Sequence, residues 1–318
     1  MLAKRPLNFR LFYEKFGIIL LLLLEILIFS ITSKNFLTVN NLFLVARQVS
    51  FYGIAAVGMT MVLLVGHIDI SVGAILAFSG CLAATLMTEY NLPIYIAVLI
   101  SIGMGGLFGL VTGTVTTVLN IYSLITSLAM QIIIKGFTFL MTRGASVKGL
   151  PTEFKYFGQG YVFDVVPVPV VIMLVTFLLG FIILNTTYLG RRIYAVGGNT
   201  EAARLSGIHT KSIVIITFVI SGITAGIAGV LMAARLGVGQ PSTGADFAMD
   251  VLTATMLGGI SLQGGKGFVL NALLGSFIIG ILTNGLVMLG VMEYWQWIIK
   301  GLVFITAVAM SSFEAKKS

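Results

Sequence analysis

Residues 213–234 read IVIITFVISGITAGIAGVLMAA and contain no charged side chain. Continuous apolar runs also occupy residues 16–29, 94–100 and 165–184. A helix needs about 20 apolar residues to cross the hydrocarbon core of a bilayer, whereas a barrel strand would alternate polar and apolar residues. Because a helix satisfies its own backbone hydrogen bonds in lipid, the run predicts a membrane-spanning helix.

The composition of the whole chain agrees with this prediction. The 318 residues are 58% hydrophobic and 9% charged, with a mean hydropathy of +1.07, whereas a soluble domain has about 25% charged residues. So few charges cannot cover a water-facing surface, and the 37 glycines suit close packing between membrane helices. We expect an all-α polytopic membrane protein that forms one transmembrane domain over residues 1–318.

The apolar runs predict about ten spans joined mostly by short connections. Two connections are longer, at 143–164 and 186–211. The expected spans cover residues 16–33, 43–65, 70–88, 93–119, 122–142, 165–185, 212–234, 248–262, 268–289 and 293–312.

The distribution of basic residues predicts the orientation. The net charge of +8 would suggest a nucleic-acid partner in a soluble protein, but in a membrane protein Lys and Arg concentrate in cytoplasmic loops. With the N-terminus inside, the inner segments hold the larger set: Lys4, Arg5, Arg10, Lys15, Arg191, Arg192, Arg204, Lys211, Lys266, Lys316 and Lys317. The outer segments hold Lys34, Arg143, Lys148, Lys155 and Arg235. This bias predicts both termini in the cytoplasm, an even number of spans and no nucleic-acid partner. The basic N-terminal lead and the apolar run after it also fit a signal peptide, but the run is longer than a signal-peptide core and no clear A-x-A site follows it, so we expect an uncleaved first span.

A polar segment, GHIDISVG at residues 66–73, interrupts two apolar runs. An ionisable group at membrane depth is costly and usually faces protein or a water-filled cavity. Asp69 and Ser71 are therefore candidates for the path of a transported substrate, at a break in a helix. The alternative is a capped turn at the membrane edge.

Three amides also lie inside apolar runs, at Gln48, Gln131 and Asn284. Amides suit the hydroxyl groups of a sugar, so these residues join Asp69 and Ser71 as candidates for the path; each could instead form a helix–helix hydrogen bond. Glu25 and Arg47 lie in consecutive spans and could pair, which would offset their desolvation. The alternative for Glu25 is contact with a partner subunit.

The most polar stretch of the chain is the inner connection at 188–211. Asn199 or Thr200 can cap a short helix, Glu201 lies in its first turn, and Gly207 can end it. A compact helix on the inner side predicts a docking surface for a soluble partner, and the alternative is a solvated loop.

The glycine-rich run GGISLQGGKG at 258–267 is not a phosphate loop. That motif requires GxxxxGK[ST], but Ile260 and Gly267 occupy two of its fixed positions. We expect a tight turn between two spans. His67 and His209 are the only histidines and lie far apart, and Cys81 is the only cysteine. The sequence predicts no catalytic residue, metal site or cofactor, so we expect a protein that is not an enzyme.

A duplication is indicated by two segments, 105–137 and 272–302. Each contains a helix rich in small residues, a short break, and then IIKG, at 133–136 and 298–301. Many transporters are built from internal repeats with the substrate path between them. Two ordinary helix hairpins are the alternative.

Three stretches together resemble the permease subunits of ribose-type monosaccharide ABC importers. Residues 55–73 resemble AVGMT…GIDLSVG, residues 189–208 resemble LGR…YAxGGN…AA…SGI, and residues 257–267 resemble LGGTSLxGGxG. The similarity covers nearly the whole chain. His67 stands where a Gly is frequent, and Glu25 is not required by the family pattern, so the role of each stays open.

The resemblance implies a division of labour between subunits. An ATP-binding subunit would dock inside, a sugar-binding protein would dock outside, and a second permease copy or a paralogue would complete the path in the bacterial plasma (inner) membrane. The segment EAARLSG at 201–207 resembles the EAAxxxG loop that couples bacterial importers to their ATPase. The expected coupling residues are Gly198, Asn199, Glu201, Ala202, Ala203, Ser206 and Gly207.

Other functions stay open at this point. A secondary transporter driven by an ion gradient would use Asp69 or Glu25 as its ion site, and a receptor-type membrane protein would use only the docking loop. The cargo of an importer could be ribose, another sugar, a sugar-derived signal or a nucleoside, and the sequence does not distinguish a homodimer from a heterodimer.

Overall fold

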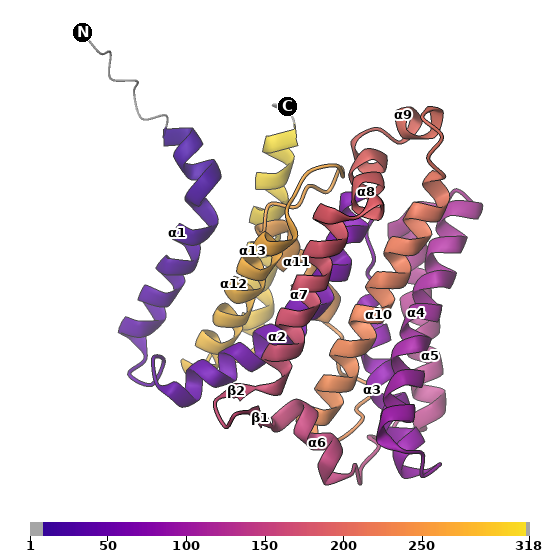
Figure 1. The fold of residues 1–318 in the computed structure, drawn as a ribbon. Helices are drawn as coiled ribbons and strands as arrows, with labels where there is room; N and C mark the ends of the chain where they lie inside the picture. Colours follow the sequence, from indigo (N-terminus) through magenta and orange to yellow (C-terminus); the bar gives the residue numbers. More distant parts are fainter. Residues whose placement is uncertain (1–8, 316–318) are drawn as a thin grey trace.

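The computed structural model describes residues 9–315, which form thirteen helices and one small hairpin (Figure 1). Lys4, Arg5, Lys316 and Lys317 of the charge count lie outside these residues. The helices are α1 (Phe9–Thr32), α2 (Val39–Leu64), α3 (Val72–Thr88), α4 (Ile94–Val118), α5 (Ser123–Thr142), α6 (Thr152–Gln159), α7 (Val168–Thr186), α8 (Tyr188–Gly198), α9 (Thr200–Leu205), α10 (Thr210–Leu236), α11 (Phe247–Leu257), α12 (Val269–Met288) and α13 (Glu293–Ala315). Strands β1 (Tyr161–Val162) and β2 (Val166–Pro167) pair antiparallel.

Six helices in the described part are long and apolar enough to cross a membrane: α2, α4, α5, α7, α10 and α12. Shorter apolar helices occupy residues 17–32, α3 and α11. The predicted helical membrane protein is confirmed, while the total of about ten spans stays a prediction. The span predicted at 248–262 is shorter in the structure, because α11 gives way to the turn that begins at Gly258 and Gly259.

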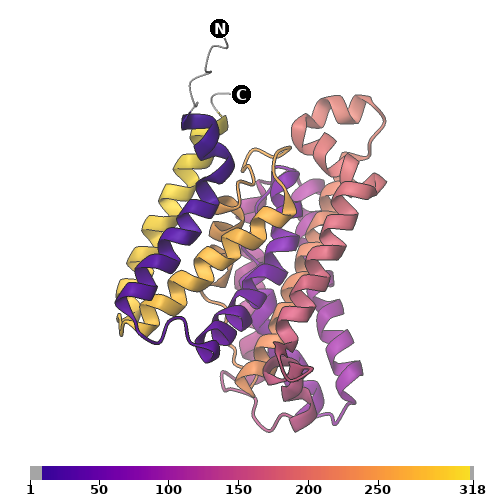
Figure 2. The same cartoon turned by 60° about the vertical axis from the view of Figure 1, so that its left-hand side comes forward.

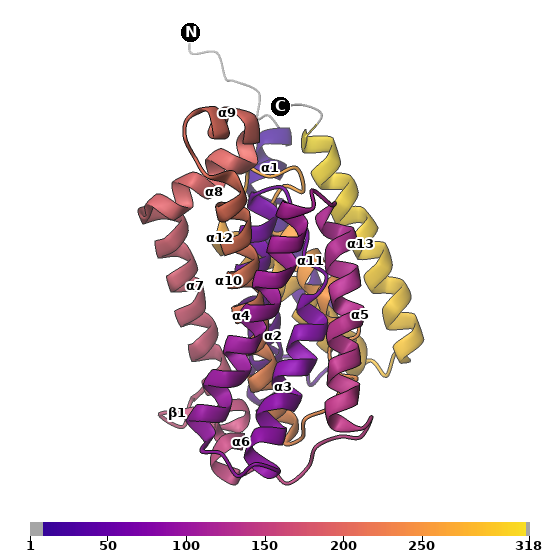
Figure 3. The ribbon, with the colours of Figure 1, turned by 90° about the vertical axis from the view of Figure 1, so that its right-hand side faces the viewer.

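The two ends of the bundle carry different elements. The start of α1, the end of α13, and α8 and α9 lie together at one end, which we call the α9 end (Figures 1 and 3). The short helix α6 and the β1–β2 hairpin lie at the opposite end, the α6 end (Figure 1). The helix α1 lies at the edge of the bundle, where it packs on α12 (Figure 2).

The core is built around α2 and α10. Most of α2 is buried from Val49 onward, and α10 packs on α2, α3 and α4. Small residues allow this packing: a Cβ added at Gly105 of α4 would lie 2.5 Å from the carbonyl oxygen of Gly222 on α10. Outer helices expose large apolar side chains such as Leu99 and Leu140, as expected for surfaces that face lipid.

Two short helices begin inside the bundle. The break at 65–71 leads into α3, and the break at 237–246 leads into α11. Their starts meet, since a Cβ added at Gly73 would lie 2.5 Å from the carbonyl oxygen of Gly244. From there α3 runs toward the α6 end, where Met87 packs near Phe154, and α11 leads toward the α9 end. We call α3 and α11 the half-helices.

The half-helices belong to two similar sets of elements. The first set is α2 to α5 and the second is α10 to α13; in each, a long helix is followed by a half-helix and two further helices. Because α2 runs toward the α9 end and α10 runs away from it, the sets have opposite directions (Figure 1). The two segments of the predicted duplication are α4–α5 and α12–α13. This arrangement supports an inverted repeat over two ordinary hairpins.

Candidate functional site

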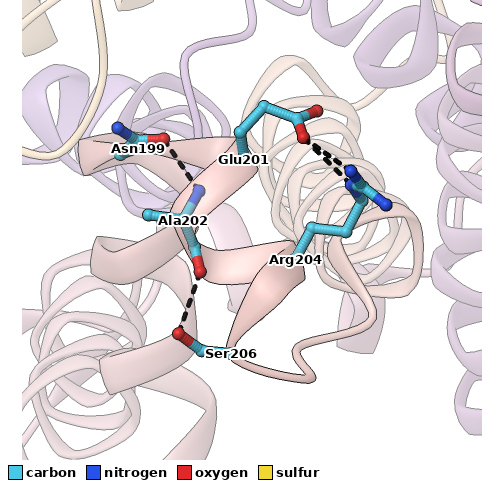
Figure 4. Close-up of polar contacts among 5 residues, drawn as sticks. All are labelled: Asn199, Glu201, Ala202, Arg204 and Ser206. Atoms are coloured by element: carbon cyan, nitrogen blue, oxygen red, sulfur yellow. Dashed lines mark hydrogen bonds and ion pairs between the residues drawn. The ribbon is translucent and has the colours of Figure 1, made fainter.

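The predicted short helix at the inner connection is present as α9 (Figure 4). Asn199 rather than Thr200 caps it, because the Asn199 side-chain oxygen accepts a hydrogen bond from the Ala202 backbone N–H at 2.9 Å. The Ser206 hydroxyl donates to the Ala202 carbonyl at 2.9 Å, and Gly207 ends the turn with φ +84°. The predicted short helix is thus confirmed, and its docking role stays a prediction.

The helix α9 projects from the bundle and is largely exposed (Figures 1 and 3). Glu201 and Arg204 form an ion pair at 2.9 Å while remaining 72% and 62% exposed, and Leu205 is 80% exposed. An exposed pair stabilises little, so these side chains are available to another protein. Of the predicted coupling residues, Ala203 is buried and the others are exposed: Gly198, Asn199, Glu201, Ala202, Ser206 and Gly207.

The base of this segment is interlocked with the ends of two core elements. A Cβ added at Gly197 would clash with the Leu64 carbonyl oxygen at the end of α2, and it would lie 2.6 Å from the Gly265 nitrogen. The Gly265 N–H donates to the Leu64 carbonyl at 2.8 Å. We call Leu64, Gly197, Gly264 and Gly265 the glycine junction; here only glycine lets the three backbones approach so closely.

A tyrosine reinforces the junction. The Tyr194 hydroxyl on α8 donates to the Gly267 carbonyl at 2.8 Å. Burial raises the pKa of the Tyr194 phenol, which keeps it protonated as a donor. The glycine-rich run at 258–267 is a tight turn, as predicted, but the sequence did not reveal that it contacts the inner connection. The three stretches that carried the family resemblance therefore meet at one place.

Asp69 lies fully buried at the break before α3. One carboxylate oxygen accepts the Ser71 N–H at 3.1 Å and the Ser71 hydroxyl, and the other accepts the Ser221 hydroxyl of α10 at 2.9 Å. Nearby, the Ile68 N–H donates to the Ser123 hydroxyl at 3.0 Å. The geometry makes Asp69 a link between the break and the middle of α10, and its contact with a substrate stays a prediction.

The other predicted path residues have different surroundings. Asn284 exchanges hydrogen bonds with Asn41 at 3.0 and 3.1 Å, which joins α12 to α2. Gln48 lies beside Tyr52. Gln131 lines a cavity whose walls do not include the other four predicted residues.

The Glu25–Arg47 pair is wrong. The Arg47 guanidinium donates to the Gln159 carbonyl at 3.0 Å and lies 5.1 Å from the Tyr161 ring centroid, while Glu25 has a buried oxygen with no hydrogen-bond partner in the described chain. We expected Glu25 and Arg47 to lie close together because their helices are consecutive in the chain. In the structure, Arg47 contacts α6 and β1 instead.

The cavity at Gln131 has a volume of about 190 Å³ and lies between α3, α5 and residues 241–245. Thr138, Ser242 and Lys135 also line it, and Lys135 has no carboxylate partner among the described residues. It adjoins the start of α3, at the meeting point of the half-helices. Such a site offers hydrogen-bond donors and acceptors to a polar molecule.

The sequence analysis missed a partly buried ion pair. Lys300 on α13 and Asp250 on α11 lie 2.7 Å apart, next to Tyr52. The available signal was Asp250, the one charged residue of α11, and Lys300, the one charged residue in the apolar middle of α13. Within the part of the chain that the structure describes, no group of three His, Cys, Asp or Glu side chains could hold a metal ion.

Comparison with known proteins extends these observations. The family described as "Branched-chain amino acid transport system / permease component" matches residues 41–308. The chain is 42% identical to the ribose import permease protein RbsC of Escherichia coli K12, over 92% of this chain and 91% of that protein. It is 36% identical to RbsC of Haemophilus influenzae, covering 100% and 99%, and 36% identical to the D-allose transport system permease protein AlsC of E. coli K12, covering 98% and 96%. No solved structure matches.

Proposed function

Because the chain belongs to the family of branched-chain amino acid transport system permease components, we propose that it is the membrane-spanning subunit of an ATP-binding-cassette importer for a monosaccharide. The relatives named for ribose and allose transport support a sugar as cargo. The single structural observation that carries the proposal is the exposed helix α9, whose base is interlocked with the ends of α2 and of the α11–α12 turn.

The proposal assigns partners to the two ends. An ATP-binding subunit, on which ATP is hydrolysed, docks at the α9 end, which is cytoplasmic and holds the start of α1 and the end of α13. A sugar-binding protein docks at the α6 end outside the cell. About ten spans cross the bacterial inner membrane, and a second copy of the chain or a paralogue completes the path.

The path residues follow from the cavities and contacts. Gln131 contacts the sugar in the cavity of about 190 Å³. Asp69, Ser71, Gln48 and Asn284 also act on the path: Asp69 joins the break before α3 to α10, and Asn284 joins α12 to α2. Amide and hydroxyl groups can exchange hydrogen bonds with sugar hydroxyls without carrying charge.

The mechanism links the ATPase to the half-helices. Closure of the ATPase moves α9 and α8, and the glycine junction passes this movement to Leu64 and Gly265 because their backbones are in contact. Leu64 leads into the break before α3, and Gly265 lies in the turn that follows α11. Packed elements that can adopt two arrangements, such as α8–α9 and the segments at Leu64 and Gly265, can transmit a movement between distant sites.

The test uses proteoliposomes that contain the chain, its ATPase and its binding protein. Glu201→Arg and Gly207→Trp are expected to leave membrane insertion intact and to reduce ATP-driven uptake of radiolabelled D-ribose, D-allose or D-xylose by more than tenfold, while ATP hydrolysis continues. The matched control is Glu201→Asp, which keeps the negative charge at the same exposed position of α9.

Two outcomes would contradict the proposal. Normal ATP-driven uptake in both Glu201→Arg and Gly207→Trp would refute the docking role of α9. Uptake by the chain alone under an ion gradient would instead identify a secondary transporter, and competition by a nucleoside but by none of the three sugars would change the cargo class.

A further inference from the structure

A second cavity opens at the α9 end and shares no lining residue with the cavity at Gln131. Its volume is about 530 Å³, and its walls come from the break before α3, the α4–α5 turn, α9 and the start of α10. Pockets that hold small molecules have volumes of about 300–1,000 Å³. Nothing in the coupling mechanism requires an open space of this size beside α9.

The walls of this cavity are rich in neutral hydrogen-bonding side chains. These are Thr116, Thr117, Asn120, Tyr122, Ser123, Thr200 and Thr210. The hydroxyls of Thr116, Thr117 and Thr200 donate to backbone carbonyls, so they offer a ligand only acceptor lone pairs. Asn120, Tyr122 and Thr210 can both donate and accept, and the exposed Tyr122 adds an aromatic face. This set of groups complements a small neutral molecule with many hydroxyl groups.

The charged groups in the walls do not form a strong anion site. Glu201 already pairs with Arg204 at 2.9 Å, and Lys211 has no carboxylate partner among the described residues. Burial lowers the pKa of the His67 imidazole, so the neutral ring presents one donor and one acceptor. The cavity would therefore bind a neutral ligand mainly through hydrogen bonds from uncharged groups.

A molecule bound in this cavity can affect the coupling between α9 and the break before α3, because it contacts both. Glu201 and Arg204 of α9 form one wall, while Gly66 and His67 of the break before α3 form another. A molecule that contacts both walls binds most tightly when α9 and the break before α3 have the positions seen in this structure. Binding to one arrangement more tightly than to the other shifts the population toward it.

We propose that this cavity is a regulatory site for a monosaccharide of the transported class, which binds from the cytoplasmic side and slows the transport cycle. The identity of the sugar class and the sidedness rest on the proposed function. The site lets the imported product inhibit its own import, because occupation resists the movement of α9 that coupling requires.

The substitution Asn120→Gly tests this site with little disturbance of the fold. Asn120 is exposed and has φ +56°, a left-handed conformation that glycine adopts without strain, so the change removes only the amide. The matched control is Asn91→Gly, since Asn91 is also exposed, has φ +52°, and lies in the α3–α4 turn outside the cavity.

The experiment uses the complex of the chain with its ATPase, reconstituted so that the cytoplasmic face is outside. Binding of tritiated D-ribose, D-allose and D-xylose to that face is measured together with ATP hydrolysis. We expect one of these sugars to bind and to lower ATP hydrolysis several-fold. Asn120→Gly should weaken both effects by about tenfold, the scale of one or two lost hydrogen bonds, whereas Asn91→Gly should change neither.

Three results would overturn the inference. The first is that no sugar binds at the cytoplasmic face, and the second is that Asn120→Gly leaves sugar binding unchanged. The third is that inorganic phosphate or ribose 5-phosphate binds while the free sugar does not, which would make the cavity an anion site. Import measured in parallel separates these results from a failure of the proposed function, because a complex that imports sugar but fails them refutes only the regulatory site.

Discussion

The half-helices α3 and α11 occupy matching places in the two sets of elements, yet different interactions hold them. The break before α3 is held by Asp69, whose carboxylate reaches Ser221 on α10, in the other set. The half-helix α11 is held by Asp250, which pairs with Lys300 on α13, in its own set. The first interaction joins the two sets, and the second joins elements within one set.

The lysines of the repeated IIKG sequence sharpen this difference. Lys300 is largely buried and forms the ion pair with Asp250. Lys135 stands in the matching sequence on α5, is exposed, and lines the cavity at Gln131. Similar sequences in opposite orientations thus place one lysine in a structural pair and leave the other available to a ligand.

The largest expected effect comes from removing the interaction between the sets. Asp69→Ala deletes three hydrogen bonds and leaves the buried Ser221 and Ser71 hydroxyls to find other partners. Loss of a buried, hydrogen-bonded carboxylate costs about 3 kcal/mol. The measurement is the free energy of unfolding of the purified chain in detergent, together with ATP-driven uptake.

The control for Asp69 is its counterpart before α11. Asp246 is exposed and makes no side-chain capping bond, so Asp246→Ala should change the free energy of unfolding by less than about 0.5 kcal/mol. Equal losses in the two variants would show that the two breaks are held alike and would remove the distinction.

The next effect concerns the pair within the second set. Lys300→Met leaves the carboxylate of Asp250 buried without its cation, but Tyr52 remains beside it. We expect a loss of about 2 kcal/mol in the free energy of unfolding. Adding Asp250→Asn should recover most of this loss by removing the unpaired charge, and no recovery in the double variant would argue that Lys300 stabilises the fold by packing alone.

Much of this fold was predictable because lipid restricts the choices. Apolar runs such as 213–234 had to be helices, and the polar signals around Asn199 correctly predicted α9. The break at Asp69 was also visible, since a carboxylate and glycines interrupt an apolar run. These features depend on local sequence and on burial in hydrocarbon.

The contacts between distant segments were not predictable from this single sequence. Leu64, Gly197 and Gly265 meet through glycine backbones, which leave no pattern of charge or hydrophobicity to match across the chain. The error at Arg47 has a related cause: neighbouring helices were known to be antiparallel, but their rotations, which decide where a side chain points, were not. The partner of Lys300 was missed for the same reason.

The substitution Lys135→Met should change stability least, and it distinguishes Lys135 from Lys300 most directly. Lys135→Met should alter the free energy of unfolding by less than about 0.5 kcal/mol, because Lys135 is exposed and has no carboxylate partner among the described residues. Uptake should nevertheless fall, because the cavity loses a hydrogen-bond donor beside Gln131. Measured beside Lys300→Met, the two variants should separate transport from stability. A loss of stability in Lys135→Met as large as that in Lys300→Met would show that both lysines are structural, and unchanged uptake would remove Lys135 from the path.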